Sequence, residues 1–305
     1  MLWTSIRCDL EAIMWSRREF LSTVGAGLAL PAGTRAWLAP QEEIKTGLNG
    51  PVGLQMWSLR EYLPNDLPGT LAKVRAMGFR EVEGAGLWKR PVAELKAALD
   101  TAGLRCQSAH MGFERLRDDA PGAFAEAKAL GATWVVCPWI THDKEFTRDD
   151  ALKAADTFNK VGSAADGAGL RFAYHCHGYE MLPSPEGTRF DTLAQNTDPK
   201  RVLFQVDVFH ALHGGGNPVD LINRYASRVK SLHLKDLKKG VAITKGTGTA
   251  TPDVDVPLGT GQVDWPAVLR AAVKAGASLY YVEDESADPW GHIPQSLQYL
   301  KSVKL

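Results

Sequence analysis

The sequence lacks the cysteine patterns of a zinc finger or a disulfide-stabilised domain. Among its 305 residues are four cysteines. They are Cys8, Cys106, Cys137 and Cys176, and no two of them form a CxxC pair. Structural zinc sites and small disulfide-rich domains both need closely spaced cysteines. We therefore exclude both classes.

The sequence also lacks an excess of charge of either sign. Lys plus Arg and Asp plus Glu each number 35, which gives a formal net charge of zero and a pI near 7.1. Proteins that bind a nucleic-acid backbone usually carry a basic excess or a basic stripe. We find neither and expect no nucleic-acid partner.

No hydrophobic run is long enough to cross a membrane. The longest apolar stretch near the N-terminus, residues 22–32, is short and contains several glycines, so we expect no stable membrane insertion. This stretch follows Arg17 and Arg18, and the combination resembles a bacterial twin-arginine export signal. The alternative is a frayed basic N-terminus followed by a short helix. We predict a signal in residues 1–40, a polar linker in 41–50 and a periplasmic location.

Residues 51–305 repeat one pattern: a short apolar run, a polar residue, and then an amphipathic segment. Eight apolar runs end near Trp57, Glu83, His110, Pro138, His175, Asp207, His233 and Glu283. The spacing between successive run ends is similar except for the last one, from His233 to Glu283. This longer segment contains a Gly/Thr-rich insertion, residues 239–261. Eight such units predict a single (β/α)8 TIM barrel. The rival fold, an open doubly wound sheet, would favour a glycine-rich phosphate loop after the first strand, which residues 55–60 do not provide.

The stretch 201–236 shows how polar residues follow the strands. One apolar run leads into Asp207 and His210, and the next leads into His233. Between them, residues 218–225 carry apolar side chains with helical spacing. Strand, helix and strand predict a βαβ unit with parallel strands, whose carboxyl ends carry the chemistry in α/β folds.

Four of these strand ends are consecutive and carry groups that bind metals. They are His175, Asp207, His233 and Glu283. Two imidazoles and two carboxylates suit Mn²⁺, Co²⁺, Zn²⁺ or Fe²⁺ better than Ca²⁺. We predict one divalent metal ion as cofactor, with Mg²⁺ also considered and the identity left open.

Several motifs, in this order, resemble the xylose isomerase-like barrels described as sugar phosphate isomerases/epimerases. They are VGLQMWSLR (52–60), FREVEGAG (79–86), AHMGF (109–113), AYHCHGYE (173–180), FQVDVFH (204–210), SLHLKD (231–236), PLGTGQVDW (257–265) and YYVEDE (280–285). The resemblance implies that Asp207, His233 and Glu283 are metal ligands. Ketose 3-epimerases of this superfamily have a Glu where this chain has His175. The run around His175 instead resembles inosose dehydratase-like members.

The site residues follow from these patterns and from the resemblance. The predicted catalytic residues are Glu283, His175 and His177. The predicted substrate-binding residues are Glu83, His110, His210, Lys235 and Trp57. Structural alternatives remain open at this point: Asp207 is also a favourable helix N-cap, and His233 is also a plausible core histidine. His175 and His177 compete for the ligand position.

The predicted function is a divalent-metal-dependent sugar isomerase or epimerase that abstracts a proton next to a carbonyl and forms an enediolate. The alternative is a lyase or dehydratase that acts on a keto-sugar, an inosose or an oxidised glycoside with the same metal site. Two weaker alternatives are a non-catalytic sugar-binding barrel and an endonuclease-like phosphodiesterase. The expected partner is a small sugar or polyol, and the oligomeric state is left open.

The export signal makes a testable prediction. Changing Arg17 and Arg18 together to Lys will hold the protein in the cytoplasm, because the twin-arginine pathway reads this pair. Cell fractionation of the producing bacterium measures this, together with removal of roughly the first 36–40 residues from the exported form. Unchanged export in a strain without the twin-arginine pathway would contradict the prediction.

Overall fold

A computed structural model describes residues 44–305. The predicted export signal and the first residues of the predicted linker lie outside the described residues. Residues 44–50 contact the barrel: the side chain of Ile44 is buried, and Asn49 Nδ2 donates a hydrogen bond to the Val273 carbonyl at 2.8 Å.

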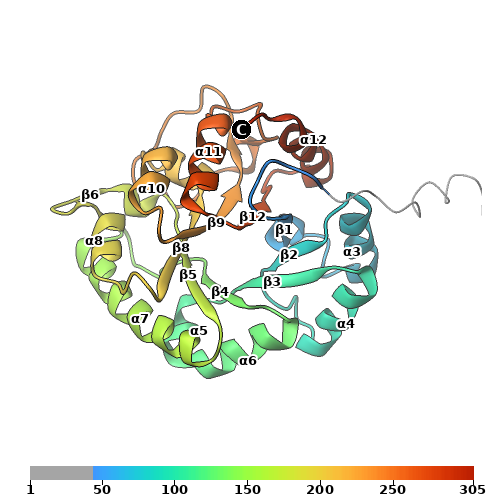
Figure 1. The fold of residues 1–305 in the computed structure, drawn as a ribbon, viewed down its shortest axis with the longest axis horizontal. Coiled ribbons are helices and arrows are strands. Elements are labelled where there is room, and N and C mark those ends of the chain that lie inside the picture. Colours follow the sequence, from blue (N-terminus) through green and yellow to red (C-terminus); the bar gives the residue numbers. More distant parts are fainter. Residues whose placement is uncertain (1–43) are drawn as a thin grey trace, which may run out of the picture. The chain divides into compact units, whose positions relative to one another are not determined.

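Eight parallel strands form a closed barrel, which confirms the predicted fold (Figure 1). The strands are β1 (Val52–Gln55), β2 (Glu81–Gly84), β3 (Arg105–His110), β4 (Trp134–Cys137), β5 (Arg171–His175), β8 (Val202–Asp207), β9 (Val229–Leu234) and β12 (Leu279–Val282). Pairing of β1 with β12, which aligns Val52 with Tyr280, closes the ring. The first strand ends earlier than predicted, because residues 56–59 turn into a short 3-10 helix.

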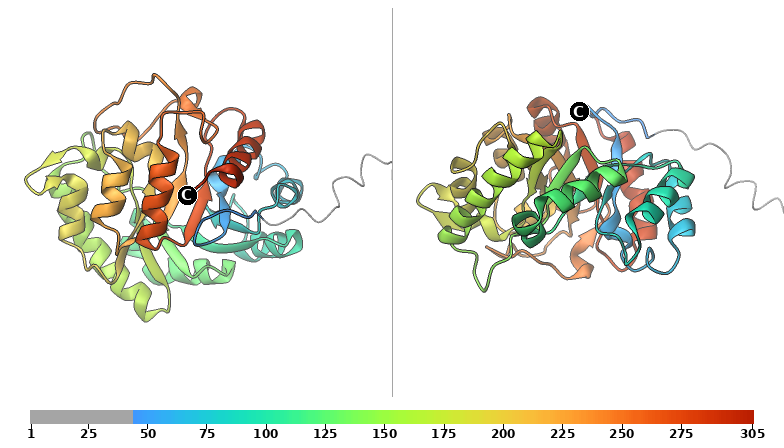
Figure 2. Two further views of the ribbon diagram at one scale, coloured as in Figure 1. Left: turned by 45° about the horizontal axis from the view of Figure 1, so that its top comes forward. Right: turned by 90° about the horizontal axis from the view of Figure 1, so that it is seen from below.

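Helices surround the strands (Figures 1 and 2). They are α3 (Leu67–Ala76), α4 (Val92–Ala102), α5 (Phe113–Asp118), α6 (Ala120–Leu130), α7 (Arg148–Gly167), α8 (Arg189–Gln195), α9 (Val208–His213), α10 (Pro218–Arg224), α11 (Trp265–Ala275) and α12 (Pro289–Ser302). Gly103 and Gly131 end α4 and α6 with φ of 69° and 89°, the left-handed cap expected at these positions. None of the helices in residues 44–305 is both long and apolar enough to span a bilayer.

The barrel interior is layered, because alternate residues of each strand face inward. The lowest layer is an interior apolar plug made of Trp134, Val136, Ala173, Leu203, Leu279 and Tyr281. Along β8, Leu203 belongs to this plug, Gln205 lies above it, and Asp207 ends the strand. The other face of β8, with Val202, Phe204 and Val206, is buried in the main core between strands and helices.

A glycine makes room for the plug. A Cβ atom on Gly53 of β1 would lie 2.7 Å from the ring of Tyr281, much closer than van der Waals contact allows. Any side chain here would push Tyr281 away from the barrel axis. Gly53 therefore fixes how the interior below the candidate site is filled.

Asp236 anchors the insertion that precedes α11. This residue begins a short hairpin, β10 (Asp236–Leu237) with β11 (Asp255–Val256), and is fully buried. Its carboxylate accepts hydrogen bonds from the backbone N–H groups of Gly259 (2.9 Å), Gly261 (3.0 Å) and Val263 (3.2 Å). Trp265 Nε1 adds a fourth donor at 2.8 Å. One side chain thus ties the loop to the end of β9.

We therefore expect Asp236→Ala to lower the free energy of unfolding by roughly 3 kcal/mol or more, because four donors, two of them buried, would lose their acceptor. Urea denaturation followed by circular dichroism measures the change. Asp156→Ala, on the exposed face of α7, is the matched control and should change stability by less than about 0.5 kcal/mol. A loss below about 1 kcal/mol for Asp236→Ala would contradict the anchoring role.

Candidate metal and active site

The four predicted metal ligands lie together at the carboxyl ends of β5, β8, β9 and β12. Asp207 and His233 are paired in register, and Asp207 Oδ2 lies 3.8 Å from His233 Nδ1. His175 Nε2 lies 3.9 Å from the same oxygen, and Glu283 Oε2 lies 2.9 Å from His233 Nδ1. Bonds of about 2.0–2.3 Å allow two ligands of one cation to be up to about 4.6 Å apart. Ligand atoms of Asp207, His233 and Glu283 all lie within 4.8 Å of one another, so these three could share one cation, and His175 lies beside Asp207. The four residues are here called the ligand cluster.

The two carboxylate oxygens of Asp207 have different surroundings. Oδ1 accepts a hydrogen bond from the backbone N–H of His210 at 2.7 Å and caps the N-terminus of α9. Oδ2 is buried and has no hydrogen-bond partner within residues 44–305. A buried carboxylate oxygen without a partner is costly, so this atom is suited to a cation. Burial also raises the pKa of Asp207 to about 7, the direction expected when the charge has no close partner.

His175 is oriented for metal binding by the residue beneath it. Gln205 Oε1 accepts a hydrogen bond from His175 Nδ1–H at 2.9 Å, which leaves Nε2 unprotonated, 3.9 Å from Asp207 Oδ2. Burial lowers the pKa of His175 well below its usual value. A neutral imidazole with a fixed tautomer is the form that ligates a metal.

Two carboxylates stabilise the protonated form of His233. Burial alone would lower its pKa, but Glu283 and Glu83 outweigh burial and raise it to about 10. The same pairing counters the effect of burial on Glu283 and lowers the pKa of that carboxyl to about 2. A cation that binds His233 Nδ1 has to displace a proton, so its affinity should fall as the pH falls.

The sequence predicts that Glu83 contacts the substrate. In the structure its side chain lies beneath the ligand cluster and not on the wall of the pocket. Its side chain is fully buried and accepts hydrogen bonds from His233 Nε2 (2.5 Å), Gln205 Nε2 (2.9 Å) and Ser108 Oγ (2.6 Å). Glu83 is not among the residues that line the main pocket. It instead orients His233, so that Nδ1 faces Asp207 and Glu283.

Lys235, also predicted to contact the substrate, lies away from the wall of the main pocket. Its side chain is 1% exposed. The ammonium group forms an ion pair with Glu285 and lies 3.9 Å from Asp255 Oδ2. These carboxylates neutralise Lys235 and hold it outside the main pocket, so it supports Glu285 at the rim.

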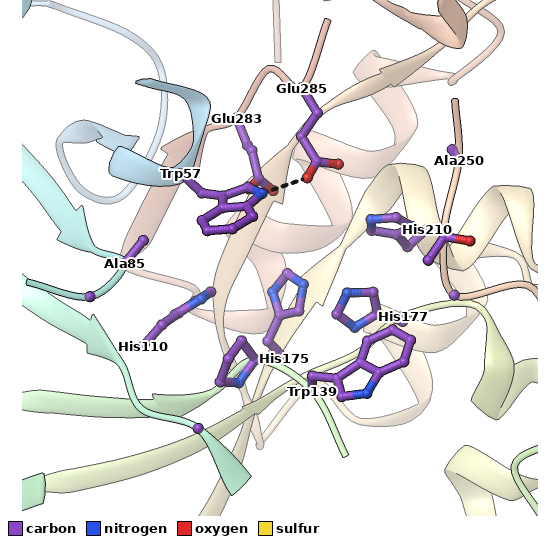
Figure 3. A pocket seen from close by; sticks show the side chains of 15 residues that line it. Trp57, Ala85, His110, Trp139, His175, His177, His210, Ala250, Glu283 and Glu285 are labelled. Atoms are coloured by element: carbon purple, nitrogen blue, oxygen red, sulfur yellow. Dashed lines mark hydrogen bonds between the residues drawn. The ribbon is translucent and has the colours of Figure 1, made fainter. Parts of the chain in front are cut away.

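The main pocket lies directly above the ligand cluster and has a volume of about 590 Å³ (Figure 3). The predicted residues Trp57, His110, His175, His177, His210 and Glu283 line it, together with Trp139 and Glu285. Burial lowers the pKa of both His177 and His210 well below the usual value. Nδ1 of each has no hydrogen-bond partner in the described part of the chain. Both are therefore neutral imidazoles with a free ring nitrogen.

His110, His175 and His233 form a second group of side chains that could bind a metal ion. His110 Nε2, however, lies 3.0 Å from Gln205 Oε1 and 3.1 Å from Glu83 Oε2. This nitrogen faces the residues beneath the site and not Asp207. We therefore favour the grouping of Asp207, His233 and Glu283, with His175 next to it.

Sequence reasoning missed the polar layer that supports the ligands. Its members, with Glu83, are Gln55, Ser108, Gln205 and Ser231. Each of these four precedes a predicted site residue by two positions: Gln55 before Trp57, Ser108 before His110, Gln205 before Asp207, and Ser231 before His233. The strand period of two, applied backwards from His110, Asp207 and His233, would have found the last three.

Comparison with known proteins identifies related chains. The Geobacillus kaustophilus inosose dehydratase is 25% identical over 272 residues, covering 75% of this chain and 85% of the relative. The Clostridium beijerinckii inosose dehydratase is 26% identical over 198 residues, covering 58% of this chain, which spans 65% of that relative.

Solved structures support the same fold. A sugar phosphate isomerase/epimerase from Parabacteroides distasonis superposes with a TM-score of 0.69 at 24% identity, covering 85% of this chain and 97% of the other. The IolI protein, solved with a zinc atom, gives a TM-score of 0.60 at 17% identity over 82% of this chain and 95% of the other. A family model described as the xylose isomerase-like TIM barrel matches residues 71–303. The chain belongs to the xylose isomerase-like TIM barrel family.

Proposed function

We propose that this protein is a metal-dependent lyase that removes water from a keto-sugar or keto-polyol, the dehydratase alternative drawn from the sequence. The observation that carries the proposal is Asp207 Oδ2, which has no hydrogen-bond partner among residues 44–305 and lies between two imidazoles beneath the main pocket. The similarity to inosose dehydratases over most of the chain favours dehydration above isomerisation or epimerisation. An isomerase or epimerase is the second candidate, because it shares the first proton transfer.

The cation would be held by His175, Asp207, His233 and Glu283. When bound, a divalent cation polarises a substrate carbonyl and stabilises negative charge on its oxygen. Gln205 and Glu83 fix the imidazoles of His175 and His233 from below, so the ligand atoms are pre-oriented. This support keeps the reacting carbonyl in one place relative to the pocket wall.

The base that removes the α-proton is Glu283 or His177. Glu283 Oε1 is the carboxylate oxygen that does not contact His233, and the residue lines the pocket. His177 Nδ1 is unpartnered among the described residues. His175 is a weaker candidate, because Gln205 engages one of its nitrogens and the other faces Asp207.

Elimination also needs an acid. The α-carbon gives its proton to the base, the neighbouring C–O bond breaks with its electron pair, and the departing hydroxyl takes a proton to leave as water. His210, which burial keeps neutral, can supply that proton after it has received the α-proton from the base. Its ring lies 4.6 Å from that of His177, centroid to centroid, on the same wall of the pocket. An isomerase would instead return a proton to the substrate carbon.

Metal binding is expected to depend on both the ligands and the layer beneath them. Asp207→Ala should remain folded but lose most bound metal and nearly all turnover. Glu83→Gln should weaken metal affinity about 10–100-fold, because an amide cannot accept all the hydrogen bonds that orient His233. Elemental analysis of the purified protein and titration of the metal-free protein with Mn²⁺ measure this.

Asp156→Ala, remote from the pocket on α7, is the control and should bind metal like the unchanged protein. Circular dichroism separates loss of metal from loss of fold. Full metal content in folded Asp207→Ala would overturn the assigned ligand set.

The reaction itself is tested with an inosose and the metal-loaded protein in D₂O. The expected product has lost one water, detected by mass spectrometry. Glu283→Gln should keep an oxygen for the cation but slow α-proton exchange by about 10²–10⁴-fold if Glu283 is the base. His177→Asn is the matched comparison: if it alone abolishes exchange, the base is His177.

A product of unchanged mass, with exchanged hydrogen, would favour the isomerase or epimerase over the lyase. No exchange into an inosose or into any other keto-sugar tested, by protein that retains its metal, would refute both.

A further inference from the structure

His177 reaches the main pocket from a turn and not from a strand. It follows the last residue of β5 by two positions, and its Nδ1 has no hydrogen-bond partner within residues 44–305. The ring instead packs on other rings: it lies nearly parallel to Tyr179, at 8° and a centroid distance of 5.6 Å. Trp139 contacts it with a centroid distance of 4.8 Å (Figure 3). The position of this imidazole therefore depends on the backbone of residues 176–181 and on two aromatic neighbours.

The carboxylate of Glu180 holds this backbone. The backbone N–H of His177 donates to both carboxylate oxygens, at 3.0 Å to Oε1 and 3.2 Å to Oε2. Glu180 is fully buried and is not among the residues that line the main pocket. A buried carboxylate is costly unless hydrogen bonds satisfy it. These bonds therefore constrain the turn that carries the imidazole.

Two tyrosine hydroxyls connect Glu180 to the loop after β4. The hydroxyl of Tyr174 donates to Glu180 Oε1. Because a hydroxyl has one proton to donate, the oxygen of Tyr174 accepts from the hydroxyl of Tyr179, which lies 3.0 Å away. The Tyr179 oxygen in turn accepts from the backbone N–H of Ile140 at 3.0 Å. This chain of donors ends on Glu180, which thus joins the loops after β4 and β5.

This network is separate from the polar layer beneath the ligand cluster. Tyr174 precedes His175 on β5 and therefore faces the opposite side of the strand. There it packs on Phe158 of α7 with a centroid distance of 5.0 Å, in the main core between strands and helices. The polar layer orients the metal ligands from inside the barrel. Glu180 acts on a residue of the pocket wall.

We propose that Glu180 is a positioning residue for His177 in proton transfer. Its carboxylate fixes the backbone of His177 directly, and through the two hydroxyls it fixes the ring of Tyr179 on which the imidazole packs. The inference rests on the proposed function for what His177 does to the substrate. The hydrogen bonds that place the imidazole do not depend on that function.

The isosteric change Glu180→Gln tests this contact. One of the two oxygens that face the His177 N–H becomes an NH₂ group, so two donors oppose each other, and the turn has to shift. Moving a catalytic group by about 1 Å can cost about 10²-fold in rate. We therefore expect the metal-loaded variant to exchange the α-proton of an inosose in D₂O at least about tenfold more slowly. Its metal content should be unchanged, because the network contains no member of the ligand cluster.

Nuclear magnetic resonance of zinc-loaded protein with ¹⁵N-labelled histidine observes the imidazole without turnover. The ring signals of His177 are assigned by their loss in His177→Asn. We expect them to shift in Glu180→Gln, while those of His233, which the polar layer holds, stay in place.

Asp191→Asn is the matched control. Asp191 is also a buried carboxylate that accepts hydrogen bonds from the backbone N–H three residues earlier, Thr188 at 2.8 Å, and from a tyrosine hydroxyl, Tyr225 at 2.6 Å. It does not line the main pocket. The variant should lose stability but keep the His177 signals in place and exchange within about twofold of the unchanged protein.

Tyr174→Phe is a second, milder variant, because it removes one donor to Glu180 and keeps the buried ring. It should shift the His177 signals in the same direction and slow exchange by a smaller factor. In the double variant, Glu180→Gln should slow exchange by no more than about twofold beyond His177→Asn alone, because both changes remove the same contribution.

Unshifted His177 signals in folded Glu180→Gln and Tyr174→Phe would overturn the inference, as would equal shifts in Asp191→Asn. Exchange by Glu180→Gln within twofold of the unchanged protein, where His177→Asn slows it, would do the same. These outcomes are separate from those of the inosose reaction. Shifted signals in protein that exchanges no proton with any keto-sugar would keep the positioning role and refute the proposed function. Unshifted signals with normal exchange would do the reverse.

Discussion

Alternate residues of a barrel strand face the interior. This two-residue period determines the depth of every side chain at the site. On β8 it places Leu203 in the apolar plug, Gln205 in the polar layer and Asp207 in the ligand cluster. On β9, Ser231 of the polar layer likewise lies two residues before His233, whereas on β12 the residue two before Glu283 is Tyr281 of the apolar plug. A one-residue shift in register would turn Asp207 toward the helices and bury a carboxylate in the main core.

The buried carboxylate of Glu83 fixes the hydrogen bonds beneath the site. It accepts hydrogen bonds from donors on four other strands, including Gln55, Ser108, Gln205 and His233. Because all these groups are fully buried, each bond is strong and each lost partner is costly. The network therefore selects one orientation of His233, and through Gln205 one orientation of His175. The ligands are held by the barrel and not by a loop.

Charges are separated between the base and the wall of the pocket. Asp207 and Glu283 face the imidazoles at the bottom, whereas Lys235 is neutralised at the side by Glu285 and Asp255. Histidines made neutral by burial line the wall between. Such a wall can exchange protons with a substrate without adding net charge to it.

The sequence by itself determined the barrel and the mouth at which the candidate site residues meet. Short apolar runs followed by polar residues predict strand ends, and the ends of parallel strands meet at one mouth. Asp207, His233 and Glu283, chosen in this way, do lie together. Only the tertiary structure decided the depth and partners of each side chain. Glu83 lies below the pocket, Lys235 pairs with Glu285 fifty residues away, and the two oxygens of Asp207 have different tasks. These features depend on strand stagger and side-chain orientation, which bring together atoms that no local pattern relates.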